Sequence, residues 1–315
     1  MPSFIKISLR GSRPDGNRKK DRKLRRGSGR GKDRREKDGR RPAGRNLPRR
    51  PLPDFLPPFL SDATAAACRF RRLANEELSR EKVRDSVGLL SEKRLHGTLK
   101  RFLSEDERTH EQKVPAADGR TSRYVADLLA DGTIYEIQTG ELWPLRQKLE
   151  FYLTKTDCRV VLVRPLIAEC FLSRIDPVSG ACLSRRRSPR HDAPLTFLSE
   201  LKPFLPFLEN PRLSFLLPAL RVEEFRFPRA VGARRGRRYE QIPTELLGLR
   251  YETAGTLGAL LPAELPEKFF AADFSRLSGL RGFALYDALA VFCALGAVCK
   301  GEKEGRAFVY YRTGR

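Results

Sequence analysis

The strongest pattern of apolar and polar positions lies between residues 91 and 163. Leu95, Leu99 and Phe102 repeat at helical spacing behind Ser91, an expected N-cap. In chain order the pattern predicts a helix over 91–103, strands around 111–114, 123–129 and 133–139, a helix over 144–152 and a strand over 159–163. The last of these is a continuous β-branched run, typical of a strand buried on both faces. This order of elements indicates an α/β domain.

The second and third predicted strands form a hairpin with unusual polar content. Asp131-Gly132 between them is a tight-turn signal, and the turn folds Asp127 back toward Glu136. Because side chains alternate along a strand, Glu136 and Gln138 share one face. Two acids and an amide on an otherwise apolar hairpin are costly to bury alone, and a divalent cation is a suitable partner. The sequence therefore predicts a metal site; acids that face solvent are the alternative.

Further elements flank this region. A charged helix over 65–84 is interpreted as a connector that docks on the following domain. Beyond residue 163 we expect a hairpin around 171–184, a helix over 196–205 and a strand over 213–222. Two arginine-rich segments, 184–190 and 229–238, are interpreted as loops or hairpin tips. One interpretation is that their arginines, among them Arg234 and Arg235, bind phosphates. The other is that both segments are solvated loops without a partner.

The C-terminal region has a separate pattern. A short helix over 270–280 ends in a glycine turn, a second helix follows over 282–295, and strands at 298–300 and 307–311 flank a charged loop. Helix, turn, helix and a two-stranded wing resemble a winged helix-turn-helix domain. The resemblance implies DNA contacts from Arg281, Tyr286 and Asp287 on the second helix, and from Lys300, Lys303 and Arg306 on the wing. A protein-binding or dimerisation module is the alternative.

The positive charge of the chain is concentrated at the N-terminus. The net charge is +23; residues 1–50 hold 20 Lys and Arg and 5 Asp and Glu, and the other residues hold 42 Lys and Arg and 34 Asp and Glu. The tail has almost nothing to bury, so residues 1–52 are predicted to be disordered. It either raises affinity for nucleic acid by counterion release or is a mis-assigned extension of the reading frame, since Met1 is the only methionine. The basic remainder favours a polyanionic partner.

Several classes of protein are disfavoured. The six cysteines form no C-x-x-C pair, which argues against a zinc knuckle and fits reduced, buried thiols. We expect no membrane partner and a cytoplasmic location, because the chain shows neither a long apolar segment nor a signal-peptide pattern. A Gly-rich phosphate loop and a Ser-His-Asp arrangement are also missing from the sequence, which disfavours an NTPase or an acyl hydrolase.

The hairpin and its neighbours resemble the PD-(D/E)XK nuclease superfamily over residues 91–165. The resemblance implies a restriction-endonuclease-like core, that is, a mixed sheet flanked by helices, which cuts phosphodiester bonds with Mg²⁺ or Mn²⁺. It places Asp127 and Glu136 as metal ligands and Gln138 at the third motif position. The whole arrangement also resembles a group of uncharacterised bacterial proteins with such a core and a C-terminal DNA-binding module.

One departure from the family pattern matters. Gln138 stands where the family usually has Lys, and an amide carries no positive charge. Lys148 on the next helix is the candidate replacement if it reaches inward, a surface lysine being the other interpretation. Glu92 is either a third acid or a solvated helix-start glutamate. His96, one turn later, either points toward the site or, in the favoured interpretation, is a helix-surface histidine.

These patterns give an architecture and a function. The predicted parts are a tail over 1–52, a connector over 53–90, a nuclease-like domain over 91–227, a basic hairpin and transition over 228–262, and a winged helix over 263–315. The predicted function is metal-dependent hydrolysis of DNA; an inactive nuclease-fold DNA-binding or regulatory protein and an RNA-associated or structural protein are the alternatives. The resemblance also suggests a homodimer, which the residues themselves do not fix.

Overall fold

The computed structural model of the chain describes residues 52–79, 90–176, 179, 181–189, 191–226 and 239–313. Leu52–Arg315 group into one compact unit. The predicted tail up to residue 51, together with Arg234 and Arg235, lies outside the described residues.

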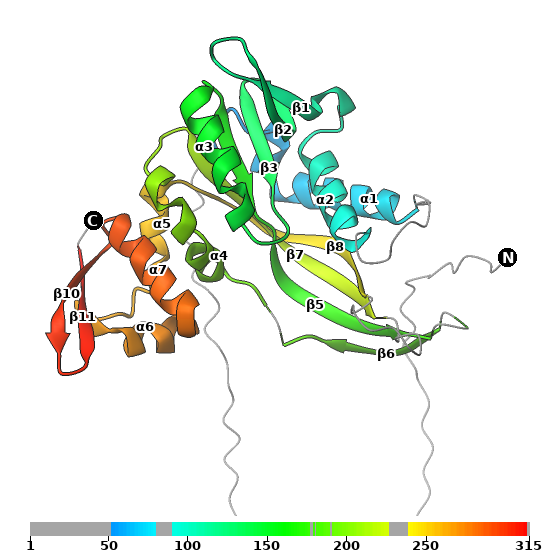
Figure 1. Cartoon of the computed structure of the whole chain (residues 1–315). Coiled ribbons are helices and arrows are strands. Elements are labelled where there is room, and N and C mark those ends of the chain that lie inside the picture. Colours follow the sequence, from blue (N-terminus) through cyan, green and yellow to red (C-terminus); the bar gives the residue numbers. More distant parts are fainter. Residues whose placement is uncertain are drawn as a thin grey trace, which may run out of the picture. The chain divides into compact units, whose positions relative to one another are not determined.

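An eight-stranded mixed sheet organises this unit (Figure 1). Its strands are β1 (His110–Pro115), β2 (Thr121–Ala130), β3 (Thr133–Ile137), β4 (Arg159–Val163), β5 (Leu166–Ile175), β6 (Cys182–Arg187), β7 (Leu213–Arg226) and β8 (Tyr239–Glu252). The spatial order is β1-β2-β3-β4-β7-β5-β6, with β8 paired to β7. The pairs β3–β4, β4–β7 and β5–β7 are parallel, and the other pairs are antiparallel. The predicted mixed sheet flanked by helices is therefore confirmed.

Two apolar clusters cover the two faces of this sheet. Helices α1 (Ala63–Ser79) and α2 (Leu90–Leu103) pack on one face, and α3 (Arg146–Lys155) and α4 (Pro194–Glu200) pack on the other. β4 confirms the expected two-sided burial: Val160 and Leu162 belong to one cluster, and Val161 and Val163 belong to the other. The short helices η3 (Trp143–Leu145) and η4 (Lys202–Phe207) extend α3 and α4.

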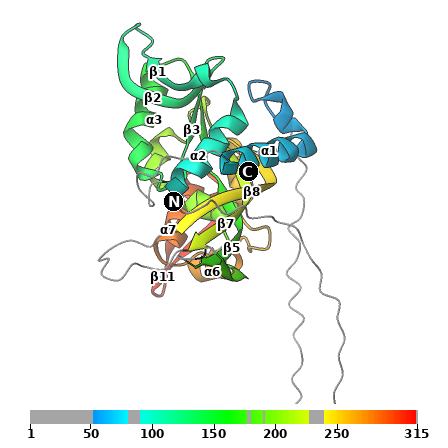
Figure 2. The same cartoon turned by 90° about the vertical axis from the view of Figure 1, so that its right-hand side faces the viewer.

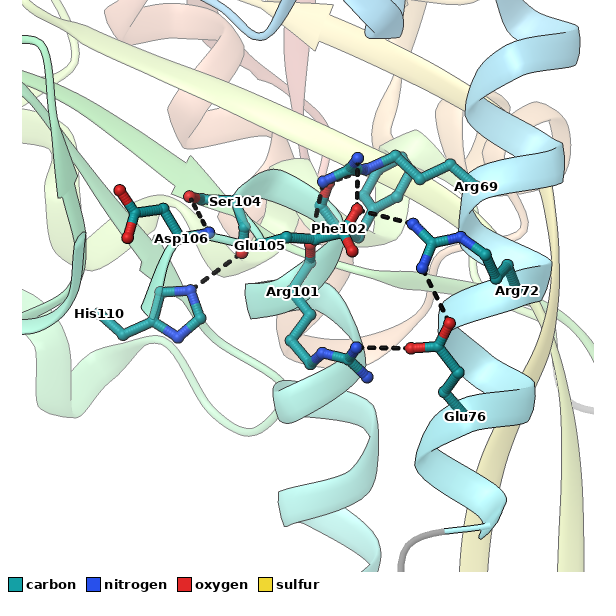
Figure 3. A network of polar contacts seen from close by, with 9 residues as sticks. All are labelled: Arg69, Arg72, Glu76, Arg101, Phe102, Ser104, Glu105, Asp106 and His110. Atoms are coloured by element: carbon teal, nitrogen blue, oxygen red, sulfur yellow. Dashed lines mark hydrogen bonds and ion pairs between the residues drawn. The ribbon is translucent and has the colours of Figure 1, made fainter. Parts of the chain in front are cut away.

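Helix α1 is joined to α2 by an ion-pair and hydrogen-bond network (Figure 3). Arg69 Nε donates to the carbonyl of Phe102 at 3.0 Å, and Arg101 pairs with Glu76 at 2.5 Å. Arg72 bridges Glu76 and Glu105. Figure 2 shows both helices crossing beside β8. This network holds the predicted connector helix against the sheet domain.

Strand β8 is the largest difference from the sequence-based prediction, which treated residues 228–262 as a hairpin tip and transition. It is 14 residues long and pairs with β7 along almost its whole length. Pro243 and Gly248 interrupt its strand signal. Both are tolerated because β8 lies at an edge and its register with β7 contains bulges.

The C-terminal elements form a small sheet with two helices beside it. They are β9 (Lys268–Phe270), α6 (Ala271–Ser278), α7 (Gly282–Ala294), β10 (Val298–Glu304) and β11 (Ala307–Arg312), with strand order β10-β11-β9. Figure 1 shows α7 beside α4, and Lys202 pairs with Asp287 at 2.6 Å. Phe292 of α7 and Phe215 of β7 belong to one apolar cluster. These elements therefore share a core with the main sheet.

A helix that crosses a membrane must meet two requirements, length and apolarity. No single helix among the described residues meets both requirements. The pair α6 and α7 meets them only when taken together, and the chain bends by 105° between the two helices.

Candidate active site

The hairpin of β2 and β3 positions the first carboxylate. Its turn is of type I′, since Asp131 and Gly132 have φ values of 47° and 68°. The pairing runs from Ala130 and Thr133 to Leu128 and Tyr135. Asp127 lies one residue beyond the last pair, and its Oδ2 accepts a hydrogen bond from the Ile137 N–H at 2.7 Å. The carboxylate therefore takes the place of a main-chain acceptor where the ladder ends.

The second carboxylate, Glu136, is buried and is held by two side chains from α3. Lys148 Nζ donates to Oε2 at 2.8 Å and lies 2.7 Å from Oε1. Tyr152 O–H donates to Oε1 at 2.9 Å. Residues 148 and 152 are one helical turn apart, so they share the face of α3 that meets the sheet. The interpretation of Lys148 as a surface lysine is wrong, because it reaches inward.

Burial dominates the electrostatics of Glu136. Its removal from water raises the pKa to about 7, and the negative charge of Asp127 contributes in the same direction. The Lys148 ammonium and the Tyr152 hydroxyl act against this shift without cancelling it. The pKa of Tyr152 is raised in turn, by burial and then by the Glu136 charge. Glu136 is therefore a carboxyl that changes charge near neutral pH.

Asp127 behaves in the opposite way. Burial acts to raise its pKa, but hydrogen bonding to His96 and the charges of His96 and Lys148, together with the Ile137 N–H, lower it on balance. His96 Nε2 lies 3.2 Å from Asp127 Oδ2. The interpretation of His96 as a helix-surface residue is therefore wrong. The two carboxyls of the site have pKa values shifted in opposite directions.

The other two predicted residues are placed differently. β3 ends at Ile137, and the Gln138 amide donates to the carbonyl of Glu141 at 2.6 Å. Its main-chain carbonyl accepts from Arg164 Nη1. Glu92 lies on α2, but its side chain is outside the described part of the structure. The structure thus brings together Asp127, Glu136 and Lys148 of the predicted set.

The side chains of the site include oxygen atoms of the kind that a divalent metal ion binds. In the described ranges, no group of three His, Cys, Asp or Glu side chains is suited to a metal ion. Mg²⁺ commonly takes only one or two carboxylates and completes its shell with water and phosphate oxygens. Asp127 and Glu136 supply two carboxylates, and the raised pKa of Glu136 indicates that added positive charge would stabilise its ionised form. In number and in ligand type, these groups match what Mg²⁺ or Mn²⁺ takes from a protein.

The predicted nucleic-acid-binding residues in the C-terminal part are mostly exposed. Exposed positions are Arg281 and Tyr286 at the start of α7, and Lys300, Lys303 and Arg306 on β10 and the turn that follows. Lys300 and Lys303 lie 3.6 and 5.0 Å from the ring centre of Phe308. Asp287, expected to be exposed, is half-buried against Lys202. Phe283, which the sequence analysis missed, is 89% exposed.

The arginine-rich segment predicted as a loop over 184–190 lies in strand β6 as far as Arg187. Arg185 pairs with Glu223 and Arg187 pairs with Glu169. Their partners are therefore carboxylates of the same sheet, Glu169 on the neighbouring β5 and Glu223 on β7 beyond it.

These features define a mixed α/β-sheet protein with a largely buried acid–lysine cluster between the β2–β3 hairpin and α3. Residues 93–254 match the model of a family described as a domain of unknown function, DUF8091. The match covers more than half of the chain, so the chain belongs to this family. The matched segment contains the hairpin, α3 and the whole eight-stranded sheet. Comparisons with curated proteins and with solved structures gave no match.

Proposed function

We propose that the chain is a metal-dependent nuclease that hydrolyses phosphodiester bonds in DNA. The observation that carries this proposal is the cluster of Asp127, Glu136 and Lys148 at the end of the β2–β3 ladder. Two carboxyls with oppositely shifted pKa values beside one ammonium group suit a site that binds a cation and a phosphate.

Each side chain has a role in this proposal. Asp127 and Glu136 would hold Mg²⁺ or Mn²⁺, which when bound supplies Lewis-acid stabilisation and a more acidic water. Lys148 Nζ would donate to a phosphate oxygen and stabilise the negative charge that develops there. The Tyr152 hydroxyl keeps Glu136 in place, and His96 does the same for Asp127. Lys148 takes the role that Gln138 cannot, since the Gln138 amide is bound to Glu141.

The C-terminal elements would deliver the site to DNA as a winged helix. The order β9, α6, α7, β10 and β11 and the exposed Lys300, Lys303 and Arg306 support this part of the proposal. Asp287 does not contribute to such a surface, because it pairs with Lys202. The basic balance of the chain suits the same polyanionic partner.

The proposal is tested by cleavage assays on the full chain. Plasmid and single-stranded DNA are incubated with Mg²⁺, Mn²⁺ or EDTA, using the parent protein, Asp127→Asn and the matched control Asp131→Asn. Asp131 is exposed in the turn of the same hairpin, and Asn tolerates its positive φ. We expect metal-dependent cleavage by the parent and the control, and loss of cleavage with retained DNA binding in Asp127→Asn. Equal cleavage by both variants would refute the proposal.

A second candidate function is a DNA-binding or regulatory protein whose core does not cut. It is favoured by the protein partners that both carboxylates already have: Lys148 and Tyr152 at Glu136, and His96 and the Ile137 N–H at Asp127. This candidate predicts DNA binding that is the same with Mg²⁺ and with EDTA, and no cleavage by the parent protein.

A further inference from the structure

A groove lies between β2 and the outer face of α3, immediately beside the candidate active site. We name it the β2–α3 groove; its volume is about 650 Å³. The lining residues used below are Arg123, Tyr124, Gln147, Glu150, Phe151 and Lys155. Figures 1 and 2 show α3 alongside the β1–β2–β3 end of the sheet. None of these six residues takes part in the function proposed above.

The groove has an aromatic floor. The rings of Tyr124 and Phe151 are 5.0 Å apart between centres and inclined at 43°. Both side chains are half-buried, so each ring is fixed by packing and still reaches the surface. A fixed, partly exposed ring offers a stacking surface to a flat ligand at little cost in conformational entropy.

Cationic groups border this floor. The Arg123 guanidinium lies 5.0 Å from the centre of the Tyr124 ring and donates to its hydroxyl at 2.9 Å. Lys155, at the end of α3, is exposed, and so is the single acid of the groove, Glu150. Two cations against one anion, with Gln147 as a neutral donor and acceptor, favour an anionic ligand.

The floor of the groove also contacts the candidate active site directly. The Tyr152 ring lies 6.3 Å from that of Tyr124 and 6.1 Å from that of Phe151, between ring centres. The hydroxyl of the same Tyr152 donates to Glu136. One buried side chain, Tyr152, therefore lies between the aromatic floor and the buried carboxyl of Glu136.

We propose that the β2–α3 groove binds an unpaired nucleotide, with its base on Tyr124 and Phe151 and its phosphates near Arg123 and Lys155. Aromatic side chains stack on bases whose faces are free, which is the case in a single strand and not inside a duplex. The inference deepens the proposed nuclease function by naming its substrate class as single-stranded nucleic acid or an unpaired end. It rests on that function only for the cleavage step.

Binding is measured first, by fluorescence anisotropy of the full chain with a labelled single-stranded DNA or its duplex in EDTA, so that no cleavage occurs. Phe151→Leu keeps apolar volume and removes the stacking surface; we expect single-strand affinity to fall about tenfold and duplex affinity to stay within about twofold. The matched control is Phe171→Leu on β5, a half-buried ring with Arg185 over it. Equal effects of the two variants, or equal losses for single strand and duplex, would overturn the proposal.

Surface charges provide variants that leave the packing of the floor intact. Arg123→Gln with Lys155→Gln should lower single-strand affinity and reduce its logarithmic salt dependence by about 1.4 for two phosphates. Glu150→Gln should raise single-strand affinity about twofold, because it removes the only acid of the groove. An unchanged salt dependence together with unchanged affinity in all three changes would contradict the inference.

The groove and the nuclease proposal fail in different ways. Loss of single-strand binding in Phe151→Leu, with no cleavage by any protein, supports the groove and removes the nuclease. Metal-dependent cleavage that is lost in Asp127→Asn, with parent-like single-strand affinity in Phe151→Leu, keeps the nuclease and removes the groove.

Discussion

The main sheet carries two clusters of charged side chains that differ in nearly every physical respect. At the β2–β3 end, Glu136 pairs with the ammonium of Lys148 in a largely buried site, and the charge of the same ammonium acts on Asp127. At the other end, acids and arginines alternate across strands at the surface. This charge ladder runs from Arg187 of β6 through Glu169 of β5, Arg221 of β7 and Glu245 of β8 to Arg71 of α1.

One glutamate from each cluster shows the difference, because the pKa values of Glu169 and Glu136 are shifted in opposite directions. The pKa of Glu169 is lowered by its hydrogen bond to Arg221, although burial acts weakly against it. The pKa of Glu136 is raised to about 7, because burial and Asp127 outweigh Lys148. An ion pair at the surface is satisfied by its partner, whereas the buried carboxyl remains short of positive charge. We therefore interpret the surface pairs as structural and the cluster around Glu136, whose pKa is raised, as the candidate site for chemistry.

The largest expected effect is on the rate of DNA cleavage, when the cation of the buried cluster is removed and the cation of the charge ladder serves as the control. Lys148→Met should lower the rate of metal-dependent DNA cleavage about a thousandfold, since the ammonium group would stabilise charge in the transition state. Arg221→Met in the charge ladder should leave the rate within about twofold. Single-turnover cleavage of the same DNA by both variants measures the difference. Comparable losses in both would mean that Lys148 acts through folding rather than chemistry.

The second effect is on stability as a function of pH. The folded-state pKa of Glu136, about 7, lies above its ordinary value of 4.5. Between these values the folded chain retains a proton that the unfolded chain has lost, so the free energy of unfolding falls as pH rises through this window. The full decline is about 3 kcal/mol, and Glu136→Gln should remove it. Urea unfolding at pH 5 and pH 8 in EDTA measures both proteins; an unchanged decline in the variant would contradict the assigned shift.

The contrast between the clusters also explains what the sequence could predict. Asp131-Gly132 and the β-branched run 159–163 are local signals, and both produced the predicted structure. Asp127 and Glu136 followed from strand alternation and a two-residue turn. The inward positions of Lys148 and His96 depend on how α3 and α2 dock, which no local pattern contains. Tyr152 could have been found, because it lies one helical turn after Lys148.

Longer-range structure was harder to predict for the same reason. β8 obtains its hydrogen bonds from β7, and Pro243 and Gly248 within it have weak strand propensity. The arginines of 184–190 look like a phosphate clamp in sequence. Their acidic partners Glu169 and Glu223 lie on other strands and become visible only in the fold.

A smaller effect on the free energy of unfolding is expected from removing either of two tyrosine hydroxyls next to the site. Tyr152→Phe removes a donor to the buried Glu136, and we expect a loss of about 2 kcal/mol in the free energy of unfolding at pH 8. The loss should be smaller at pH 5, where Glu136 is protonated. Tyr124→Phe, whose hydroxyl accepts only a surface hydrogen bond from Arg123, is the control and should change stability by less than about 0.5 kcal/mol. Equal losses in the two variants at pH 8 would mean that the buried hydrogen bond from Tyr152 to Glu136 stabilises the fold no more than the surface one.

The smallest effect has the opposite sign and comes from the charge ladder. Because the pKa of Glu169 is lowered in the folded chain, its ionised form stabilises the fold above the ordinary pKa, and this contribution is lost as pH falls through the lowered value. Glu169→Gln should therefore cost less than about 1 kcal/mol at neutral pH and nothing in acid, since the pair is exposed and screened. Urea unfolding at pH 7 and pH 3, at low and high salt, tests this. A Glu169→Gln effect as large as that of Glu136→Gln, or one that survives high salt, would remove the distinction between a structural and a chemical cluster.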